Sequence, residues 1–511
     1  QFCPNPSFPS PVISCPSCPL KYKALKDQIN EYLSSGAITK VDPDESQILS
    51  RIFSVKKSNG KNRTILDLSK INTQIIHVSF KMETYINIME IIQPRDYLAS
   101  IDLRDAFFAV NLHNDSKRFC CFEFNGDRFQ FEVLPFGLTC SPRIFSKVLR
   151  PAIIHLRSLG IRILSYLDDI FLCATSVSLL YEHIQLTLNL LISLGYAPNF
   201  EKSNLTPSNE LMHLGFIWNS SNMTISIPSE KILKVQKFAS SILRSSPTLR
   251  TLSSFLGLLV SFRPGYFLSP LHYRNLQLQL CALIKRGYNW DDKVTLNEKS
   301  VTDISWWSSC PNPLPSFYFG IFIPDVTLST DSSLTGWGGV LSSGQSVKGS
   351  WSTSESKNHI NFLELKAIEF CIRSFLPIIR NKSLSIQSDN MTSVFYMNKV
   401  GGTHSKPLCL LALSIWQLLM DNNISCKTFH IAGSDNINAD FYSRSTKLDN
   451  DYSLTQYAFN SLLSHISFTP TLDLFASRLT HKLKSYISYH FDPFSVSSDA
   501  FTLKWPNNIY L

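Results

Sequence analysis

Apolar and polar residues follow one another in patterns that predict a mixture of helices and strands. Leu25–Ile38 has apolar residues at helical intervals and a glycine near its end, which predicts an α-helix. Two strand-like runs come next, and Ser58-Asn59-Gly60 joins them; Asn-Gly is the strongest short signal for a β-hairpin. From Tyr97 to Gly215 short apolar strands alternate with helical segments, so we expect an α/β core there.

The rest of the chain predicts a helical unit and then a second strand-rich unit. Residues 228–290 have helical spacing and several lysines and arginines, which suits either a nucleic-acid-binding face or an ordinary solvated helix pair. Residues 290–320, with several prolines, are expected to be a connector. A strand-rich unit runs from Val326 to about Arg444, and a polar, aromatic tail comes after it.

Composition limits the classes of protein that these patterns can belong to. The chain has 511 residues, of which 44% are hydrophobic, enough for roughly three or four domains with real cores. The formal net charge of +9 permits a polyanionic partner without demanding one. No apolar run is long enough for a membrane span and no signal peptide is recognisable, so we expect an intracellular protein. The first residue is Gln1, which suggests a piece of a longer protein.

The cysteines point to a reducing compartment. There are 12, mostly inside apolar segments, as buried thiols would be. Cys15 and Cys18 have the spacing of zinc ligands and Cys3 lies upstream, but a second pair at a matching distance is missing. We therefore favour a loose leader rich in Pro and Ser over a zinc site.

Two adjacent acids interrupt an apolar strand pattern in the α/β region. In SYLDDIFLCA, Asp168 and Asp169 fall between the apolar runs Ile163–Tyr166 and Ile170–Cys173, which predicts a hairpin with acids in its turn. An upstream strand, in LASIDLRDAFFAV, ends at Asp102, and pairing of the two segments would bring the acids together. Carboxylates that close repel one another unless a divalent cation neutralises them, so we interpret them as metal ligands. A solvated turn is the alternative.

A second set of acids lies in the later strand-rich unit. Asp331 is on a strand that leads into a glycine-rich turn, and Glu364 is on a helical pattern among apolar neighbours. Asp389 comes after another strand, and HIAGSDNINADFYSR contains His430 and Asp440. Each of these residues alone is unremarkable; their order is the informative feature.

Four blocks in the first half resemble a reverse transcriptase of the retroelement kind. They are KKSNGKNR, IDLRDAFF, LPFGLTCSPRIF and YLDD, and the resemblance covers roughly Leu25 to Trp218. It implies that Asp102 and Asp168 bind two metal ions, that Asp169 lies beside them, and that the carbonyl of Leu103 is a further ligand. Two such ions clamp the attacking and leaving oxygens of a phosphoryl transfer.

The same resemblance implies a set of nucleotide-binding residues. The triphosphate would be bound by three cations of the finger hairpin, Lys56, Lys61 and Arg63. A 2′-hydroxyl would be excluded by the aromatic ring of Phe107, and the floor under base and template would be formed by Phe136 and Gly137. Pyrophosphate would be protonated by Lys202. Leu214 and Gly215 resemble the primer grip. A solvated edge for Lys61 and a simple core position for Phe107 are the alternatives.

The second set of acids resembles the constellation of an RNase H domain. Strand-Asp, helix-Glu, strand-end-Asp and helix-Asp correspond to Asp331, Glu364, Asp389 and Asp440. The resemblance implies the same two-metal chemistry with water as nucleophile. It also implies that His430 assists product release, with a loop histidine of no special role as the alternative, and that Asn436 is the family's loop asparagine.

Two later segments are similar to the polymerase region of DIRS-like retroelements, which use a tyrosine recombinase. They are FYMNKVGGTHSKP and the tail segments PTLDLFASRLTHKL and SDAFTLKW. No recombinase motif is visible in the chain, so a recombinase and Gag-like proteins of the same element would lie elsewhere. We expect the tail to dock on the RNase H unit.

Together the resemblances imply an α/β (α+β) fold, a fingers–palm–thumb hand followed by an RNase H-like mixed-sheet domain. The expected divisions are a leader (1–20), fingers and palm (21–225), thumb and connection (226–320), the RNase H-like domain (321–445) and a tail (446–511). The implied activity is RNA- and DNA-templated DNA synthesis with RNA degradation, using two Mg²⁺ per site, with Mn²⁺ as a substitute. The implied partners are an RNA template, a DNA primer, an RNA–DNA hybrid and dNTPs, with no membrane.

Two other functions remain open at this point. A domesticated or decayed copy would bind nucleic acid without turnover, although every metal-ligand position carries an acid. An unrelated metal nuclease would need only one acid cluster, whereas this chain has two.

Overall fold

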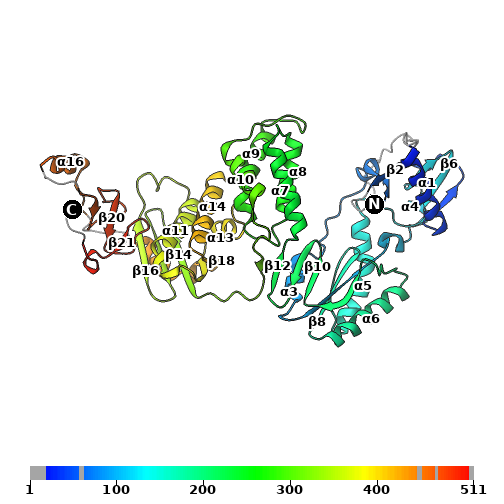
Figure 1. The fold of residues 1–511 in the computed structure, drawn as a ribbon, viewed down its shortest axis with the longest axis horizontal. Coiled ribbons are helices and arrows are strands. Elements are labelled where there is room, and N and C mark those ends of the chain that lie inside the picture. Colours follow the sequence, from blue (N-terminus) through cyan, green and yellow to red (C-terminus); the bar gives the residue numbers. More distant parts are fainter. Residues whose placement is uncertain (1–18, 57–61, 446–451, 466–469, 506–511) are drawn as a thin grey trace. The chain divides into compact units, whose positions relative to one another are not determined.

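The computed structural model describes residues 19–56, 62–445, 452–465 and 470–505, and it divides into two compact units (Figure 1). Unit 1 is Gln1–Ser226 with Tyr318–Gly320, and unit 2 is Ile227–Phe317 with Ile321–Leu511. The cysteines of the leader, Cys3, Cys15 and Cys18, lie outside the described residues.

Unit 1 contains a four-stranded antiparallel sheet in the order β7-β8-β4-β9. Its strands are β4 (Tyr97–Asp102), β7 (Arg162–Tyr166), β8 (Asp169–Ala174) and β9 (Asn204–Ser208). The helices α5 (Ser141–Ser158) and α6 (Val177–Ser193) pack on this sheet (Figure 1). Both faces of β8 are covered, which explains its unbroken apolar run: Ile170 and Leu172 lie in the core with these helices, and the ring of Phe171 contacts His213 and Trp218.

The remaining strands of unit 1 form smaller sheets. β1 (Ile38–Val41), β6 (Asp127–Phe131) and β5 (Cys121–Phe124) make one sheet, β2 (Arg51–Lys56) and β3 (Asn62–Asp67) make the predicted hairpin, and β10 (Glu210–His213), β11 (Phe216–Asn219), β12 (Thr224–Ser226) and β13 (Phe317–Tyr318) make a third. The helices are α1 (Pro19–Ser34), α2 (Ser69–Asn72), α3 (Tyr85–Ile91), η1 (Ala106–Ala109) and α4 (Asn114–Lys117).

The first predicted helix ends earlier than its apolar spacing suggested. α1 stops at Ser34, and Gly36 has a φ of +71°, a left-handed conformation that terminates helices. Ile38 then begins β1.

Unit 2 begins with a helical bundle. Its helices are α7 (Ser229–Leu243), α8 (Leu249–Val260), η2 (Ser269–His272), α9 (Arg274–Lys285) and α10 (Glu298–Ser309). Within residues 290–320, which were expected to be a connector, residues 298–309 form the helix α10, which packs on α7 and α9. Asn297 caps this helix, and Ile304 and Trp307 bury one face of it completely.

A mixed five-stranded sheet comes next, in the order β16-β15-β14-β17-β18. Its strands are β14 (Val326–Ser332), β15 (Gly336–Leu341), β16 (Ser346–Ser350), β17 (Ser383–Ser388) and β18 (Ser425–His430). β14, β17 and β18 are parallel, while β14, β15 and β16 are antiparallel. The helices are α11 (Ile360–Ser374), α12 (Leu376–Ile379), α13 (Met391–Asn398), α14 (Lys406–Asp421), η3 (Gly433–Asp435) and α15 (Ile437–Arg444).

Two adjacent glycines of β15 let helices approach this sheet from both sides. A Cβ on Gly338 would lie 2.6 Å from Tyr442 Cβ of α15, and a Cβ on Gly339 would lie 2.5 Å from Cys371 Sγ of α11. Successive residues of a strand face opposite sides, so α15 and α11 cover opposite faces of the sheet. The Gly338-Gly339 pair is therefore a packing requirement.

The tail forms α16 (Gln456–His465), the short parallel strands β19 (Leu472–Asp473), β20 (Ser485–Ser488) and β21 (Ser497–Ser498), and η4 (Ala500–Thr502). Leu474, Ile487 and Ala500 form its small core. Within the described part of the chain, no helix has the length and apolar character needed to cross a bilayer.

Candidate functional site

The predicted hairpin of SYLDDIFLCA is present, but only Asp168 of the acidic pair lies in its two-residue turn, because Asp169 is the first residue of β8. Tyr166 pairs with Asp169 across the β7–β8 hairpin, which leaves Leu167 and Asp168 in the turn. Leu167 has a φ of +56°, a left-handed conformation that is uncommon for a branched side chain and costs roughly 1–3 kcal/mol. Such strained backbone often accompanies active sites.

Pairing of β4 with β8 brings Asp102 to the same place. Asp102 lies opposite Asp169 in the register, and the N–H of Leu103 donates to the carbonyl of Asp168 at 2.9 Å. Asn199 and Lys202 hold the carboxylate: Asn199 Nδ2 lies 3.0 Å and Lys202 Nζ 3.4 Å from Asp102 Oδ1.

The electrostatics of this first centre favour a bound cation. Burial, followed by repulsion from Asp168 and Asp102, raises the pKa of Asp169 to about 6, while Lys202 acts in the opposite direction. A divalent cation would remove this repulsion. The three acids adjoin by register, but among the described residues only the second cluster gathers three carboxylate oxygens within 4.8 Å of one another.

The aromatic residues expected to surround the nucleotide do lie together. The ring of Phe107 is half-buried, with centroids 5.1 Å from Phe136 and 5.5 Å from Phe145. Gly137 has a φ of +107°, and a Cβ there would lie 2.8 Å from the carbonyl oxygen of Leu66. Lys61 and the side chains of Lys56 and Arg63 lie outside the described residues, and their roles stay predictions.

The second centre is a tight trio of carboxylates on the mixed sheet. Asp331 of β14, Glu364 of α11 and Asp389, which comes directly after β17, have oxygens within 4.8 Å of one another. Asp331 is 5% and Glu364 6% exposed, and Glu364 Oε2 has no hydrogen-bond partner within the described part of the chain. An unpartnered buried carboxylate oxygen among acids is a fit site for a divalent cation.

The pKa values of Glu364 and Asp331 are raised. Burial first, and then repulsion from Asp331 and Asp389, raises the pKa of Glu364 to about 9. Burial also raises the pKa of Asp331, against a hydrogen bond that Ser443 Oγ donates to its Oδ2. Ionising the whole trio therefore costs free energy that a cation would return.

The other expected residues of the second centre surround the trio without joining it. His430 Nε2 lies 3.1 Å from the carbonyl oxygen of Asp389, and Asn436 Nδ2 donates to the carbonyl of Thr330 at 2.9 Å. Asp440 is not one of the gathered acids: it is on α15, and its Oδ1 lies 2.6 Å from Arg444 Nη2.

Sequence reasoning missed the neutral residues that hold the acids. Ser443 bonds Asp331, and Ser203 Oγ accepts from the N–H of Asp102 at 3.0 Å. Asn390 Nδ2 donates to Asn361 Oδ1 at 3.0 Å and so links the residue after Asp389 to the first turn of α11. Only Ser443 left a usable signal, because it stands three residues after Asp440 and so on the same face of a predicted helix.

Comparison with known proteins shows which family the residues around the first carboxylate centre resemble. Residues 55–218 match the profile of the family described as reverse transcriptase (RNA-dependent DNA polymerase). The chain contains a reverse transcriptase domain. This domain and the residues after it also resemble viral polyproteins: the enzymatic polyprotein of Figwort mosaic virus (strain DxS) is 23% identical over 445 residues, 83% of this chain and 62% of that protein. The Gag-Pro-Pol polyprotein of Sheep pulmonary adenomatosis virus is 33% identical over 171 residues, 32% of this chain and 10% of that protein.

Solved structures extend the likeness beyond the reverse transcriptase domain. The foamy viral protease-reverse transcriptase in complex with dsDNA is similar with a TM-score of 0.54 and 20% identity, over 84% of this chain and 86% of that chain. The same enzyme in complex with RNA/DNA hybrid gives a TM-score of 0.52 and 18% identity, over 83% and 55% of the two chains. The predicted fold class is confirmed: a mixed α/β architecture similar to that of the foamy viral protease-reverse transcriptase. The chain spans less than two thirds of the length of the polyproteins from Figwort mosaic virus and Carnation etched ring virus.

Proposed function

We propose that this chain is the RNA-directed DNA polymerase of a retrotransposon, that it also copies DNA, and that it degrades RNA in RNA–DNA hybrids. The observation that carries the proposal is the pair of separate carboxylate centres, one on the β4–β8 strands of the reverse transcriptase domain and one on the mixed sheet. The proposed partners are an RNA template, a DNA primer, the hybrid that forms between them, and dNTPs.

At the polymerase centre, Asp102 and Asp168 would hold two Mg²⁺ ions, or Mn²⁺, with Asp169 beside them. The ions would supply charge neutralisation and activation of the primer's 3′-hydroxyl. Phe107, whose ring packs against Phe136, would contact the sugar of the incoming nucleotide and disfavour a 2′-hydroxyl. Lys202, whose ammonium already lies near Asp102, is the candidate proton donor to pyrophosphate.

At the nuclease centre, Asp331, Glu364 and Asp389 would hold the metal pair, with Asp440 as an outlying fourth acid. Glu364 would have to lose its proton for the ions to bind, because burial and its neighbours raise its pKa. His430, which is exposed and contacts the backbone of Asp389, is the candidate for assisting product release.

The proposal extends to the origin of the chain. FYMNKVGGTHSKP and the tail segments resemble DIRS-like elements, so we assign the chain to a tyrosine-recombinase retroelement whose recombinase and Gag-like proteins are encoded elsewhere. We keep the division into leader, fingers and palm, thumb and connection, RNase H-like domain and tail, and an intracellular site of action, as parts of the same proposal.

A single experiment tests both centres. Purified protein extends a DNA primer on a labelled ribonucleotide template in Mg²⁺, and extension and RNA cleavage are measured in the same tube. Asp168→Asn should abolish extension and retain cleavage, and Asp389→Asn should do the reverse, so that each Asp→Asn change is the matched control for the other. Normal extension by Asp168→Asn would contradict the polymerase assignment.

A catalytically inert nucleic-acid-binding copy is the second candidate. It predicts that wild-type protein binds the hybrid and yields no product when Mg²⁺ or Mn²⁺ is added. The filled acid positions of both centres favour the enzyme over this alternative.

A further inference from the structure

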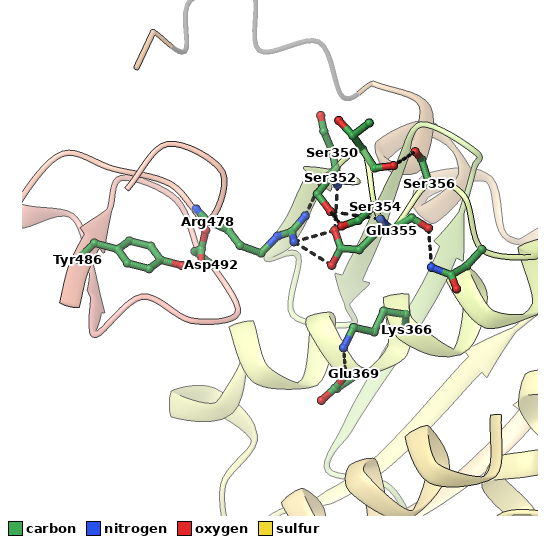
Figure 2. Close-up of polar contacts among 12 residues, drawn as sticks. Ser350, Ser352, Ser354, Glu355, Ser356, Lys366, Glu369, Arg478, Tyr486 and Asp492 are labelled. Carbon is green, nitrogen blue, oxygen red and sulfur yellow. Dashed lines mark hydrogen bonds and ion pairs between the residues drawn. The ribbon is translucent and has the colours of Figure 1, made fainter. Parts of the chain in front are cut away.

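The C-terminal residues 470–505, which we call the brace, contact the loop that leads into the helix of Glu364. Arg478 Nη1 donates to both carboxylate oxygens of Glu355, at 3.0 and 2.8 Å, and its Nη2 donates to the carbonyl of Ser350 at 2.6 Å (Figure 2). Both side chains are largely buried, 13% and 21% exposed. A charge pair this shielded from water is screened less than a surface pair and fixes geometry more firmly.

Within the brace, Arg478 is itself held in place. Its backbone N–H donates to Asp492 Oδ2 at 2.8 Å, and Tyr486 Oη donates to Asp492 Oδ1 at 2.6 Å (Figure 2). Asp492 thus connects Arg478 to β20, and the small sheet of the tail positions the guanidinium at Glu355.

The loop that Arg478 grips is tied to the catalytic strand. Glu355 closes a tight turn with Ser352, whose N–H donates to Glu355 Oε2 at 2.9 Å. Trp351, next to this turn, donates from Nε1 to the carbonyl of Ser333 at 3.0 Å, just beyond the end of the strand that carries Asp331. The loop then enters α11, where Glu364 lies in the second turn.

The brace holds α11 a second time, beyond Glu364. The guanidinium of Arg478 lies 4.8 Å from the ring centroid of Phe370, and Phe494 meets the same ring edge-on at 5.6 Å. Phe491 contacts Phe375 at 5.5 Å, one residue past the end of the helix. Glu364 is therefore on a helix that is anchored both before and after it.

We propose that the brace contributes to the function of the RNase H-like domain and that Arg478 is a positioning residue for Glu364. This inference rests on the proposed nuclease function. The oxygens of the three acids lie within 4.8 Å of one another, so they repel one another once Glu364 has lost its proton to bind a cation, and this repulsion would drive α11 away from β14 and β17. Contacts that anchor α11 on both sides oppose that displacement and keep the metal ligands gathered before the ions arrive. The tail segment FASRLTHKL contains Arg478, and its proposed role is to anchor α11.

The test compares Arg478→Ala and Arg478→Lys with wild type. Losing a residue that orients metal ligands typically costs 10–100-fold in metal affinity or activity. We expect Arg478→Ala to raise the Mg²⁺ concentration for half-maximal RNA cleavage by about tenfold, with primer extension unchanged. Arg478→Lys keeps the charge but loses the fork of donors, so it should fall between the two.

The control is Arg380→Ala. Arg380 also donates twice to one side chain, Asn422 Oδ1 at 3.1 and 2.9 Å, but it comes after α12, beyond the end of α11 that is remote from Glu364. This variant should leave the Mg²⁺ dependence of cleavage unchanged. An equal rise in both variants would mean a general loss of stability and would overturn the positioning role.

Amide hydrogen exchange of the metal-free protein separates this inference from the proposed function. Faster exchange in residues 351–375 of Arg478→Ala supports the brace, and unchanged exchange overturns it. If wild-type protein cleaves no RNA, the proposed function fails while the exchange result still decides whether the brace holds α11. If Arg478→Ala does not fold, Glu355→Gln takes its place, because it keeps the shape of the side chain and weakens the pair.

Discussion

Replacing Glu364 with glutamine should stabilise the metal-free protein at alkaline pH. The folded protein holds the proton of Glu364 up to about pH 9, whereas the unfolded chain releases it near 4.5. Between these values the folded state binds more protons than the unfolded state, so the free energy of unfolding falls as pH rises, by about 1.4 kcal/mol per pH unit. Extended from 4.5 to pH 8, this is an upper bound of about 5 kcal/mol, and the neighbouring acids share part of it.

Glutamine is neutral at every pH, so the variant does not lose free energy of unfolding in this way as pH rises. We expect Glu364→Gln to match wild type near pH 5 and to exceed it by roughly 2–5 kcal/mol at pH 8, which corresponds to a rise in Tm of roughly 5–15 °C. Calorimetry in EDTA at the two pH values measures the difference. Added Mg²⁺ should stabilise wild type more at pH 8 than at pH 5 and should stabilise the variant much less.

The control is Glu298→Gln, an exposed acid in the first turn of α10, which should change Tm little and equally at both pH values. A Glu364→Gln protein that is less stable than wild type at both pH values would refute the reasoning. It would mean that the carboxylate is stabilised in the folded state by contacts other than a metal.

Three further predictions concern other parts of the chain. Phe107→Val should raise the ratio of ribonucleotide to deoxynucleotide incorporation by about 10–100-fold in single-nucleotide extension, because a smaller side chain leaves room for a 2′-hydroxyl; an unchanged ratio would reject the gate. Gly137→Ala should lower stability by about 1–3 kcal/mol in urea unfolding, because its Cβ meets a backbone oxygen, whereas Gly126→Ala, with a similar positive φ and open space, should cost less; equal losses would exclude the steric cause. Arg274→Ala should lower the free energy of unfolding by about 2–4 kcal/mol, because this buried arginine donates to three backbone carbonyls after α13. The control Arg250→Ala removes an exposed arginine and should lower it far less. Comparable losses in the two variants would show that burial is irrelevant.

The hairpin with acids in its turn was predictable because its signal is local. Apolar runs on either side of the acids predict two strands and leave three residues between them, whereas the structure begins the second strand at Asp169 and shortens the turn to Leu167 and Asp168. The helix Glu298–Ser309 was not predicted. Prolines and tryptophans in this part of the sequence obscured its helical pattern, and on its buried face only Ile304 and Trp307 are both apolar and fully buried. The end of the first helix at Ser34 was predicted wrongly. The apolar spacing continues past Ser34, but the left-handed conformation of one residue, Gly36, ends the helix.

The sequence by itself determined which acids stand at strand ends and helix faces, and hence which residues could bind metals. Only the tertiary structure decided that Asp331, Glu364 and Asp389 form a tight trio while Asp440 pairs with Arg444 outside it. It also decided the raised pKa of Glu364 and the pairing of Arg478 with Glu355, 123 residues away. Coulombic and desolvation free energies depend on distance and burial in space, and the order of residues along a chain specifies neither until the chain has folded.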